Sequence, residues 1–132
     1  MERIKRIQLW LYLIVIITLI ISGVYSSSLK NKEILKNKAL TSGTITGYSF
    51  DKGRGHNGVY VYYEYIVNNK KIQDKFLWEY RSDSFVGLTF PVIYNQNDIE
   101  SNRMLILPDD FANFNLDFPD SLKWVVKSCH PY

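Results

Sequence analysis

Residues 59–77 read VYVYYEYIVNNKKIQDKFL, and this stretch decides the fold. β-branched and aromatic residues fill 59–67 and return in 71–77, which is typical of strands. Between the two runs, Asn68-Asn69-Lys70 is a polar turn sequence. We therefore predict a hairpin of two antiparallel strands, 59–67 and 71–77.

Side chains alternate between two faces along the first strand of this hairpin. The face predicted to enter the core carries Val59, Val61, Tyr63, Tyr65 and Val67. The other face presents Tyr60, Tyr62 and Ile66 around Glu64, and we predict it as a possible binding face for a glycan, a peptide or a partner protein. Two plainer interpretations stay open: either tyrosine is present as a good strand residue, or the C-terminal segment covers this face.

Three more strands are predicted from runs of similar composition at 44–50, 88–94 and 103–107. Pro91 favours an edge or bulge position for its strand, because proline cannot donate to a ladder. The polar run NQNDIESN at 95–102 is predicted to be the loop before the last strand. The fold class is therefore mainly β, a small antiparallel barrel-like or sandwich-like domain of about five strands.

The C-terminal segment is rich in Phe and is predicted to be a short helical or irregular packing arm. Asp109 or Asp110 can cap a helical turn that presses Phe111 and Phe114 on the sheet. A second turn is expected after Pro119.

An apolar run, IQLWLYLIVIITLIISGVY, extends from Ile7 to Tyr25. It contains twelve Leu, Ile or Val residues. As a helix, its 19 residues would reach ~28 Å, close to the ~30 Å hydrocarbon thickness of a bilayer. We expect an uncleaved transmembrane anchor. The rival interpretation is a cleaved signal peptide, supported by the basic residues before the run and by the small residues around Val24-Tyr25-Ser26.

The expected organisation has three parts: 1–25, a basic tail and transmembrane anchor; 26–40, a Lys/Asn-rich stem; and 41–132, a small β domain with its packing arm. Basic residues flank the apolar run on both sides, so the positive-inside count is close to a tie. Long C-terminal regions translocate largely regardless of charge. We therefore expect a single-pass protein of the cell membrane with its domain outside the cytoplasm, and the opposite topology stays open.

The net charge of +3 is unevenly distributed. Residues 1–38 hold seven Lys or Arg and two Asp or Glu, whereas residues 39–132 hold nine and eleven. The folded part therefore lacks the basic patch of a nucleic-acid binder, and no nucleic-acid partner is expected. Cys129 is the only cysteine, so no intramolecular disulfide can form.

Catalytic and metal-binding motifs are sparse. His56 and His130 are the only histidines, and neither lies in a recognisable nucleophile or metal motif. Asp51 with His56 could form an acid–base pair, but nothing marks a nucleophile beside them. Three aspartates of the C-terminal segment lack the spacing and glycine of a calcium loop. No enzyme activity, cofactor or metal is expected.

The succession GTITG at 43–47, the tyrosine-rich strand, the turn at 67–70 and GLTFPVIY at 87–94 resembles the DUF3592-type domains of bacterial membrane proteins. The resemblance covers roughly residues 42–107 and implies a small β-rich module next to a transmembrane helix, with no established activity. This chain departs from the family at Asn97-Asp98, where an Asn-Pro step is frequent, and it has one apolar segment where many members have two. The resemblance carries over no functional residue.

An anchor joined to a β module without a catalytic set indicates a binding or structural role in the bacterial envelope. The partner expected is a protein or another envelope component. An alternative from a different class is an immunity-type protein that blocks a toxin at the membrane. Abundant Lys, Asn and Ile are the only compositional hint of a bacterial origin.

Overall fold

The structure is a computed structural model that describes residues 2–50, 58–79 and 85–129. The chain divides into two compact units, Met1–Glu33 and Ile34–Tyr132. The first unit consists of most of a single helix, α1 (Glu2–Lys36). The last residues of α1 belong to the second unit, where Ile34 is fully buried in the core. The predicted stem is thus helical up to Lys36.

Large apolar side chains are exposed along the N-terminal unit, among them Trp10, Leu11, Ile16 and Leu19. Among the described residues, no helix is both long enough and apolar enough to cross a membrane. The side chains of Ile7, Leu9 and Val24 in the apolar run lie outside the described set.

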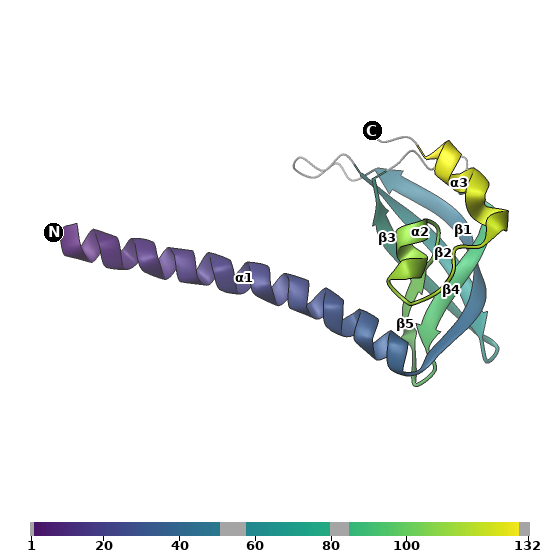
Figure 1. Cartoon of the computed structure of the whole chain (residues 1–132), viewed down its shortest axis with the longest axis horizontal. Helices are drawn as coiled ribbons and strands as arrows, with labels where there is room; N and C mark the ends of the chain where they lie inside the picture. Colours follow the sequence, from purple (N-terminus) through teal and green to yellow (C-terminus); the bar gives the residue numbers. More distant parts are fainter. Residues whose placement is uncertain (1, 51–57, 80–84, 130–132) are drawn as a thin grey trace. The chain divides into compact units, whose positions relative to one another are not determined.

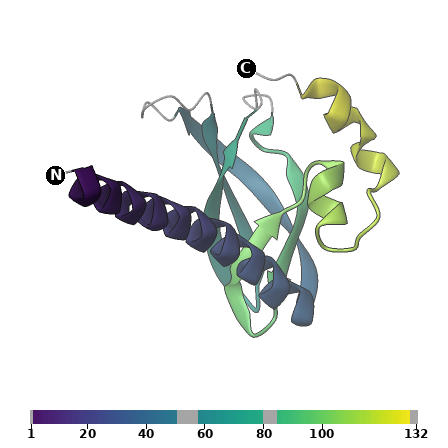
Figure 2. The same cartoon turned by 60° about the vertical axis from the view of Figure 1, so that its left-hand side comes forward.

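The second unit is built on five antiparallel strands (Figure 1). They are β1 (Lys38–Phe50), β2 (Val59–Val67), β3 (Lys70–Trp78), β4 (Thr89–Asn95) and β5 (Asp98–Met104). Their order in the sheet is β3-β2-β1-β4-β5, and the sheet curls until it is nearly closed (Figure 2). The prediction of a mainly β, barrel-like domain of five strands is confirmed.

The long central strand, β1, makes this curvature possible because it pairs with two partners in succession. Its first half pairs with β4, from Lys38 opposite Asn95 to Thr44 opposite Thr89. Its second half pairs with β2, from Gly43 opposite Tyr65 to Phe50 opposite Val59, with a bulge at Thr46. Bulges bend a strand and increase its twist. The β2–β3 hairpin and the β4–β5 hairpin are thereby folded toward each other around β1.

Gly43 lies where β1 turns from one partner to the other. A Cβ atom there would lie 2.6 Å from Cγ2 of Val92 and 3.1 Å from Cε of Met104. The absence of a side chain therefore lets β1 approach β4 and β5 closely.

The interior of the barrel is apolar and aromatic. The whole face predicted for the core, Val59, Val61, Tyr63, Tyr65 and Val67, is buried as expected. Three aromatic rings pack in series within the core. The ring centroids of Trp78 and Phe85 are 6.3 Å apart, and those of Phe85 and Phe90 are 5.8 Å apart.

The strand boundaries correct the sequence-based prediction in two places. β1 begins at Lys38, six positions before the predicted start at Thr44, because its first half pairs with β4. β5 occupies Asp98–Met104, whereas 103–107 was predicted. The polar run 95–102 is thus a two-residue turn at Gln96-Asn97 followed by most of a strand, whose polar side chains find partners across the barrel.

Pro91 does not mark an edge strand or a bulge, because β4 lies between β1 and β5 and its register to β1 is regular there, but Pro91 lies just outside the ladder to β5, which begins at Val92. The carbonyl of Pro91 accepts a bond of 2.8 Å from the amide of Leu105. In an antiparallel strand the N–H and C=O of one residue point the same way. The side of Pro91 that lacks an N–H donor therefore faces the region beyond the end of β5. For this reason β4 loses no hydrogen bond to β1.

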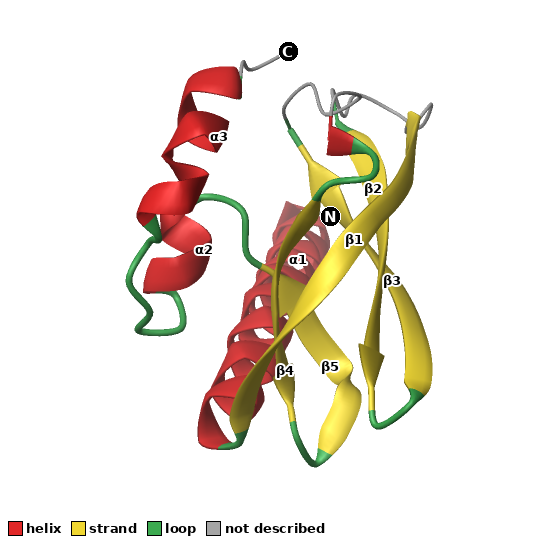
Figure 3. Ribbon diagram, turned by 90° about the vertical axis from the view of Figure 1, so that its right-hand side faces the viewer, coloured by secondary structure: helices red, strands yellow, loops and turns green. Residues whose placement is uncertain are grey.

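The C-terminal arm is helical, as predicted. It comprises α2 (Pro108–Ala112), a 3-10 turn η2 (Asp120–Leu122) and α3 (Lys123–Ser128). The carboxylate of Asp110 accepts bonds of 3.0 and 2.8 Å from the amides of Ile106 and Leu107, and Phe111 and Phe114 are buried. Figure 3 shows α2 and α3 on the side of the domain away from β2 and β3. The ammonium of Lys38 bonds the carbonyl of Phe114 at 3.4 Å and joins the arm to the start of β1.

Candidate functional site

The predicted binding face lies on the outer side of β2, and the described part of the C-terminal arm does not cover it. Ile66 is 61% exposed and Tyr62 is 39% exposed, while Tyr60 and Glu64 are half-buried. The four residues therefore form one open surface on a rigid strand. We call it the outer tyrosine face.

Neighbouring strands hold the side chains of the outer tyrosine face in place. Lys75 of β3, opposite Tyr62, holds its ammonium 4.7 Å from the ring centre of Tyr60 and 5.9 Å from that of Tyr62. The hydroxyl of Tyr62 lies 3.2 Å from that of Ser49 on β1. The two rings and their cation thus form a preorganised platform, since a cation over an aromatic face is attracted by the ring quadrupole.

Glu64 sits at the centre of the outer tyrosine face and is ion-paired. Its carboxylate lies 2.7 Å from the ammonium of Lys71 on β3. The hydrogen bond from Lys71 lowers the pKa of Glu64 below its ordinary value, with a smaller contribution from Gln73. Glu64 is therefore a fixed negative charge between the tyrosines and exposed Ile66.

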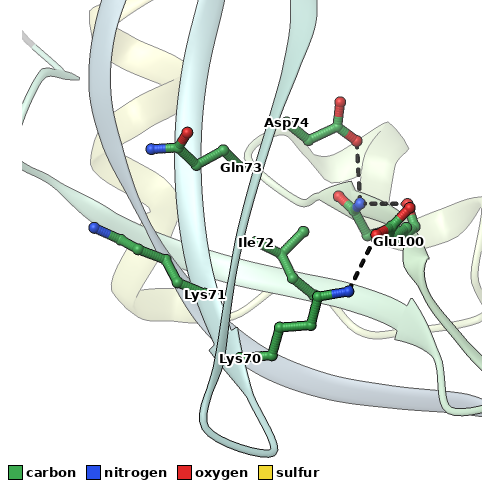
Figure 4. Close-up of a pocket in the computed structure, with 7 residues that line it drawn as sticks. Lys70, Lys71, Ile72, Gln73, Asp74 and Glu100 are labelled. Atoms are coloured by element: carbon green, nitrogen blue, oxygen red, sulfur yellow. Dashed lines mark hydrogen bonds and ion pairs between the residues drawn. The ribbon is translucent and has the colours of Figure 1, made fainter.

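A second surface lies where the barrel fails to close, between the edge strands β3 and β5. We call it the seam. It contains a pocket of about 350 Å³ (Figure 4). The pocket is lined by Lys70, Lys71, Ile72, Gln73, Asp74, Glu100 and Asn102.

Side chains bridge the seam in place of backbone bonds. The side-chain amide of Asn102 donates to the carboxylate of Asp74 at 3.0 Å and to the carbonyl of Glu100 at 2.8 Å. Lys70 and Glu100 form an ion pair at 3.2 Å, with both side chains largely exposed. Asn102 is itself buried, so its bonds replace those it would make in water.

Two core tyrosines form hydrogen bonds to β5 from inside the barrel and so contribute to the seam. Tyr63 donates its hydroxyl proton to the side-chain oxygen of Asn102, and Tyr65 donates to the carbonyl of Ile99. Burial, followed by the nearby charge of Asp74, raises the pKa of both phenols well above the ordinary value. Both tyrosines therefore stay neutral donors at physiological pH.

The alternation along 59–67 places Tyr63 and Tyr65 in the core and does not by itself predict the seam. One signal was available: a buried tyrosine hydroxyl needs a polar partner, and two such hydroxyls on the core face require polar groups inside the barrel. Asp74, on the inward-facing side of β3, was the nearest candidate in sequence.

The proposed acid–base pair of Asp51 and His56 lies outside the described residues, as does His130. Within 2–50, 58–79 and 85–129, no group of three or more His, Cys, Asp or Glu is placed to hold a metal ion. Cys129 is a free, half-buried thiol, and burial raises its pKa.

The fold and these two surfaces define a small, nearly closed antiparallel β-barrel with an aromatic outer face and a polar seam. Comparisons of the chain with protein-family models, curated proteins and solved structures give no match. The resemblance to DUF3592-type domains therefore stays a prediction.

Proposed function

We propose that this chain is a single-pass membrane protein of the bacterial envelope whose β domain, held outside the cytoplasm, binds a partner protein through the outer tyrosine face without doing chemistry. The observation that carries the binding role is the outer tyrosine face itself. Ile66 is exposed there beside the rings of Tyr60 and Tyr62, which already hold the ammonium of Lys75. Exposed aromatic and apolar groups on a rigid strand are typical of interaction surfaces.

Membrane anchoring rests on the apolar run Ile7–Tyr25 and on the form of its helix. α1 is continuous from Glu2 to Lys36, and the large apolar side chains described between residues 10 and 21 are exposed to solvent. A helix that is apolar on all sides is stable when lipid or protein surrounds it. A bilayer would surround the helix and cover all of these apolar side chains.

The anchor is tested by a charge in the middle of the run. Ile16→Lys should lower membrane insertion by ~2.5–3.5 kcal/mol, because a lysine at the centre of a bilayer is costly. Ile16→Leu is the matched control and should leave the protein in the membrane fraction after alkaline extraction. Equal extraction of both variants, at the size of the full chain, would count against a spanning helix.

The binding role is tested by crosslinking the full chain in intact cells. Ile66→Ser should remove the crosslinked species, because it takes an exposed apolar group from the outer tyrosine face. Leu40→Ser is the matched control, since Leu40 is 55% exposed and lies on β1 away from this face. A partner lost in both variants, or no partner under several growth conditions, contradicts the proposal. A crosslink to a secreted toxin would favour the immunity alternative.

A further inference from the structure

The outer edge of β3 has backbone groups without strand partners in the described part of the chain. The hairpin turn Asn68-Asn69 has φ of 53° and 61°, the conformation of a two-residue turn that makes Val67 and Lys70 a hydrogen-bonded pair. Pairs alternate along an antiparallel ladder. The N–H and C=O groups of Lys71, Gln73, Lys75 and Leu77 therefore point away from β2.

Part of this edge is already protected. Asp74 accepts a bond of 2.8 Å from the amide of Lys75 with its own carboxylate. Lys71 and Gln73, in contrast, line the seam pocket. Their backbone groups thus belong to the section of the edge at the pocket, which the Asn102–Asp74 bond and the Lys70–Glu100 ion pair also cross.

β5, on the opposite side of the seam, does not pair with the free edge of β3. Because every neighbouring pair in the sheet is antiparallel, β3 and β5 run in the same direction. On β5, the hydroxyl of Tyr65 donates to the carbonyl of Ile99, and the side-chain amide of Asn102 donates to the carbonyl of Glu100. Backbone groups of β5 are therefore already bonded from inside the barrel. The outward backbone groups of β3, in contrast, have no strand partner in the described part of the chain.

The side chains along the β3 edge are basic. Lys70 and Lys71 begin the strand, and Lys75 follows on the same outer side as Lys71. Lys71 is ion-paired with Glu64 at 2.7 Å but stays 57% exposed, and Lys75, over the Tyr60 ring, has no carboxylate partner among the ion pairs of the described residues. If two copies paired antiparallel about Gln73, Lys71 of each would lie opposite Lys75 of the other. Like charges placed opposite each other are destabilising, whereas opposite charges stabilise such a pair. Self-pairing is thus disfavoured, and an acidic strand is favoured.

We propose that the edge of β3 binds an extended acidic segment of the partner protein by strand addition, antiparallel to β3, with carboxylates opposite Lys71 and Lys75. This inference rests on the proposed function in that both require a protein partner, but it names the chemistry of that partner and adds main-chain contacts at the edge of β3, beside two lysines that also flank the outer tyrosine face. Main-chain bonds from Lys71 and Gln73 would supply affinity, and the lysines would select the segment.

The test uses the full chain in detergent and a peptide of nine residues, the length of β3, that alternates Glu with Val. Addition of this peptide should slow hydrogen exchange at the amides of Lys71 and Gln73. The same peptide with Lys in place of Glu should not. No protection at about 1 mM peptide, or equal protection by both peptides, overturns the proposal.

Two variants locate the contact. Gln73→Pro removes an amide that points away from β2, so it should abolish peptide binding, whereas Gln73→Ala should retain it. If Gln73→Pro does not fold, Lys71→Glu with Lys75→Glu serves instead, and it should weaken binding of the acidic peptide at least about tenfold and reverse the preference. A dimer of the full chain that Gln73→Pro disrupts would overturn the acidic partner in favour of a second copy.

The two proposals fail differently. A cellular crosslink that depends on Ile66, together with no binding of the acidic peptide, overturns strand addition alone. Peptide binding at β3, with a crosslink that Ile66→Ser leaves unchanged, overturns the outer tyrosine face and supports strand addition.

Discussion

Tyr63 on β2 donates a hydrogen bond to Asn102 on β5, 39 residues further along the chain. These strands are separated in the sheet by β1 and β4, so the bond crosses the interior of the barrel. It ties β2 to the edge strand β5 across the seam, where the described residues of β3 and β5 form no backbone ladder. The side-chain amide of Asn102 also donates a hydrogen bond of 3.0 Å to the carboxylate of Asp74 on β3. One buried amide group thus links three strands.

Removing this hydroxyl should destabilise the domain. Tyr63→Phe leaves the buried oxygen of Asn102 with one bond fewer, which costs ~1–3 kcal/mol in the free energy of unfolding. Tyr62→Phe is the matched control, because its hydroxyl is on the outer surface, and it should change stability by less than ~0.5 kcal/mol. Urea unfolding of the full chain measures both. Equal losses would show that the bond to Asn102 contributes nothing special to closure.

Gly43 should be the least replaceable of the glycines in β1. Gly43→Ala would bring a methyl group to 2.6 Å from Val92, so the strands must separate, at a cost of ~1–3 kcal/mol. A Cβ at Gly47 would meet nothing within 4 Å, and Gly47→Ala should be close to neutral. The two unfolding midpoints test this difference. A midpoint for Gly43→Ala no lower than that for Gly47→Ala would mean that the approach of β1 to β4 does not require glycine.

Alkaline pH should destabilise the domain through its buried phenols. The pKa values of Tyr63 and Tyr65 are raised in the native state by burial, while in the unfolded chain both ionise near ~10. The native state therefore keeps protons that the unfolded state releases. Stability should be constant below this value and fall above it by up to ~1.4 kcal/mol per pH unit for each tyrosine.

The alkaline loss is measured as the free energy of unfolding between about pH 8 and pH 11. Tyr63→Phe and Tyr65→Phe should each flatten the curve, and Tyr62→Phe should not. An equal alkaline slope in Tyr63→Phe and the parent chain would contradict this source of the pH dependence.

The sequence predicted best the elements whose side chains separate into two faces. β2 alternates between buried residues and half-buried or exposed ones over its whole length, and its predicted bounds, 59–67, agree with the structure. β5 was misplaced because Asp98–Asn102 contains one apolar residue, so it has the composition of a loop. Its polar side chains are accommodated by Lys70 and Asp74 of a distant strand.

The two candidate surfaces were unequally predictable for the same reason. The outer tyrosine face lies on one strand, so the period of two residues in the sequence was sufficient to assemble it. The seam requires Asp74 and Asn102 to meet, which depends on how far the sheet curls around β1. That curvature comes from the bulge at Thr46 and the contact at Gly43, and neither has a pattern in the sequence that fixes it.

The proposed topology predicts that the β domain can be labelled from outside the cell. Cys129 is the natural probe, but its thiol is half-buried and burial raises its pKa, so its reaction with a maleimide should be slow. Ser42→Cys in a Cys129→Ser background places a thiol on an exposed position of β1 and should react faster.

With a membrane-impermeant maleimide, both proteins should be labelled in intact cells, at the size of the full chain and in the membrane fraction. Labelling of the Ser42→Cys protein only after permeabilisation would put the domain on the cytoplasmic side, because its thiol is accessible without unfolding. The partner carrying the acidic segment would then have to be a cytoplasmic protein.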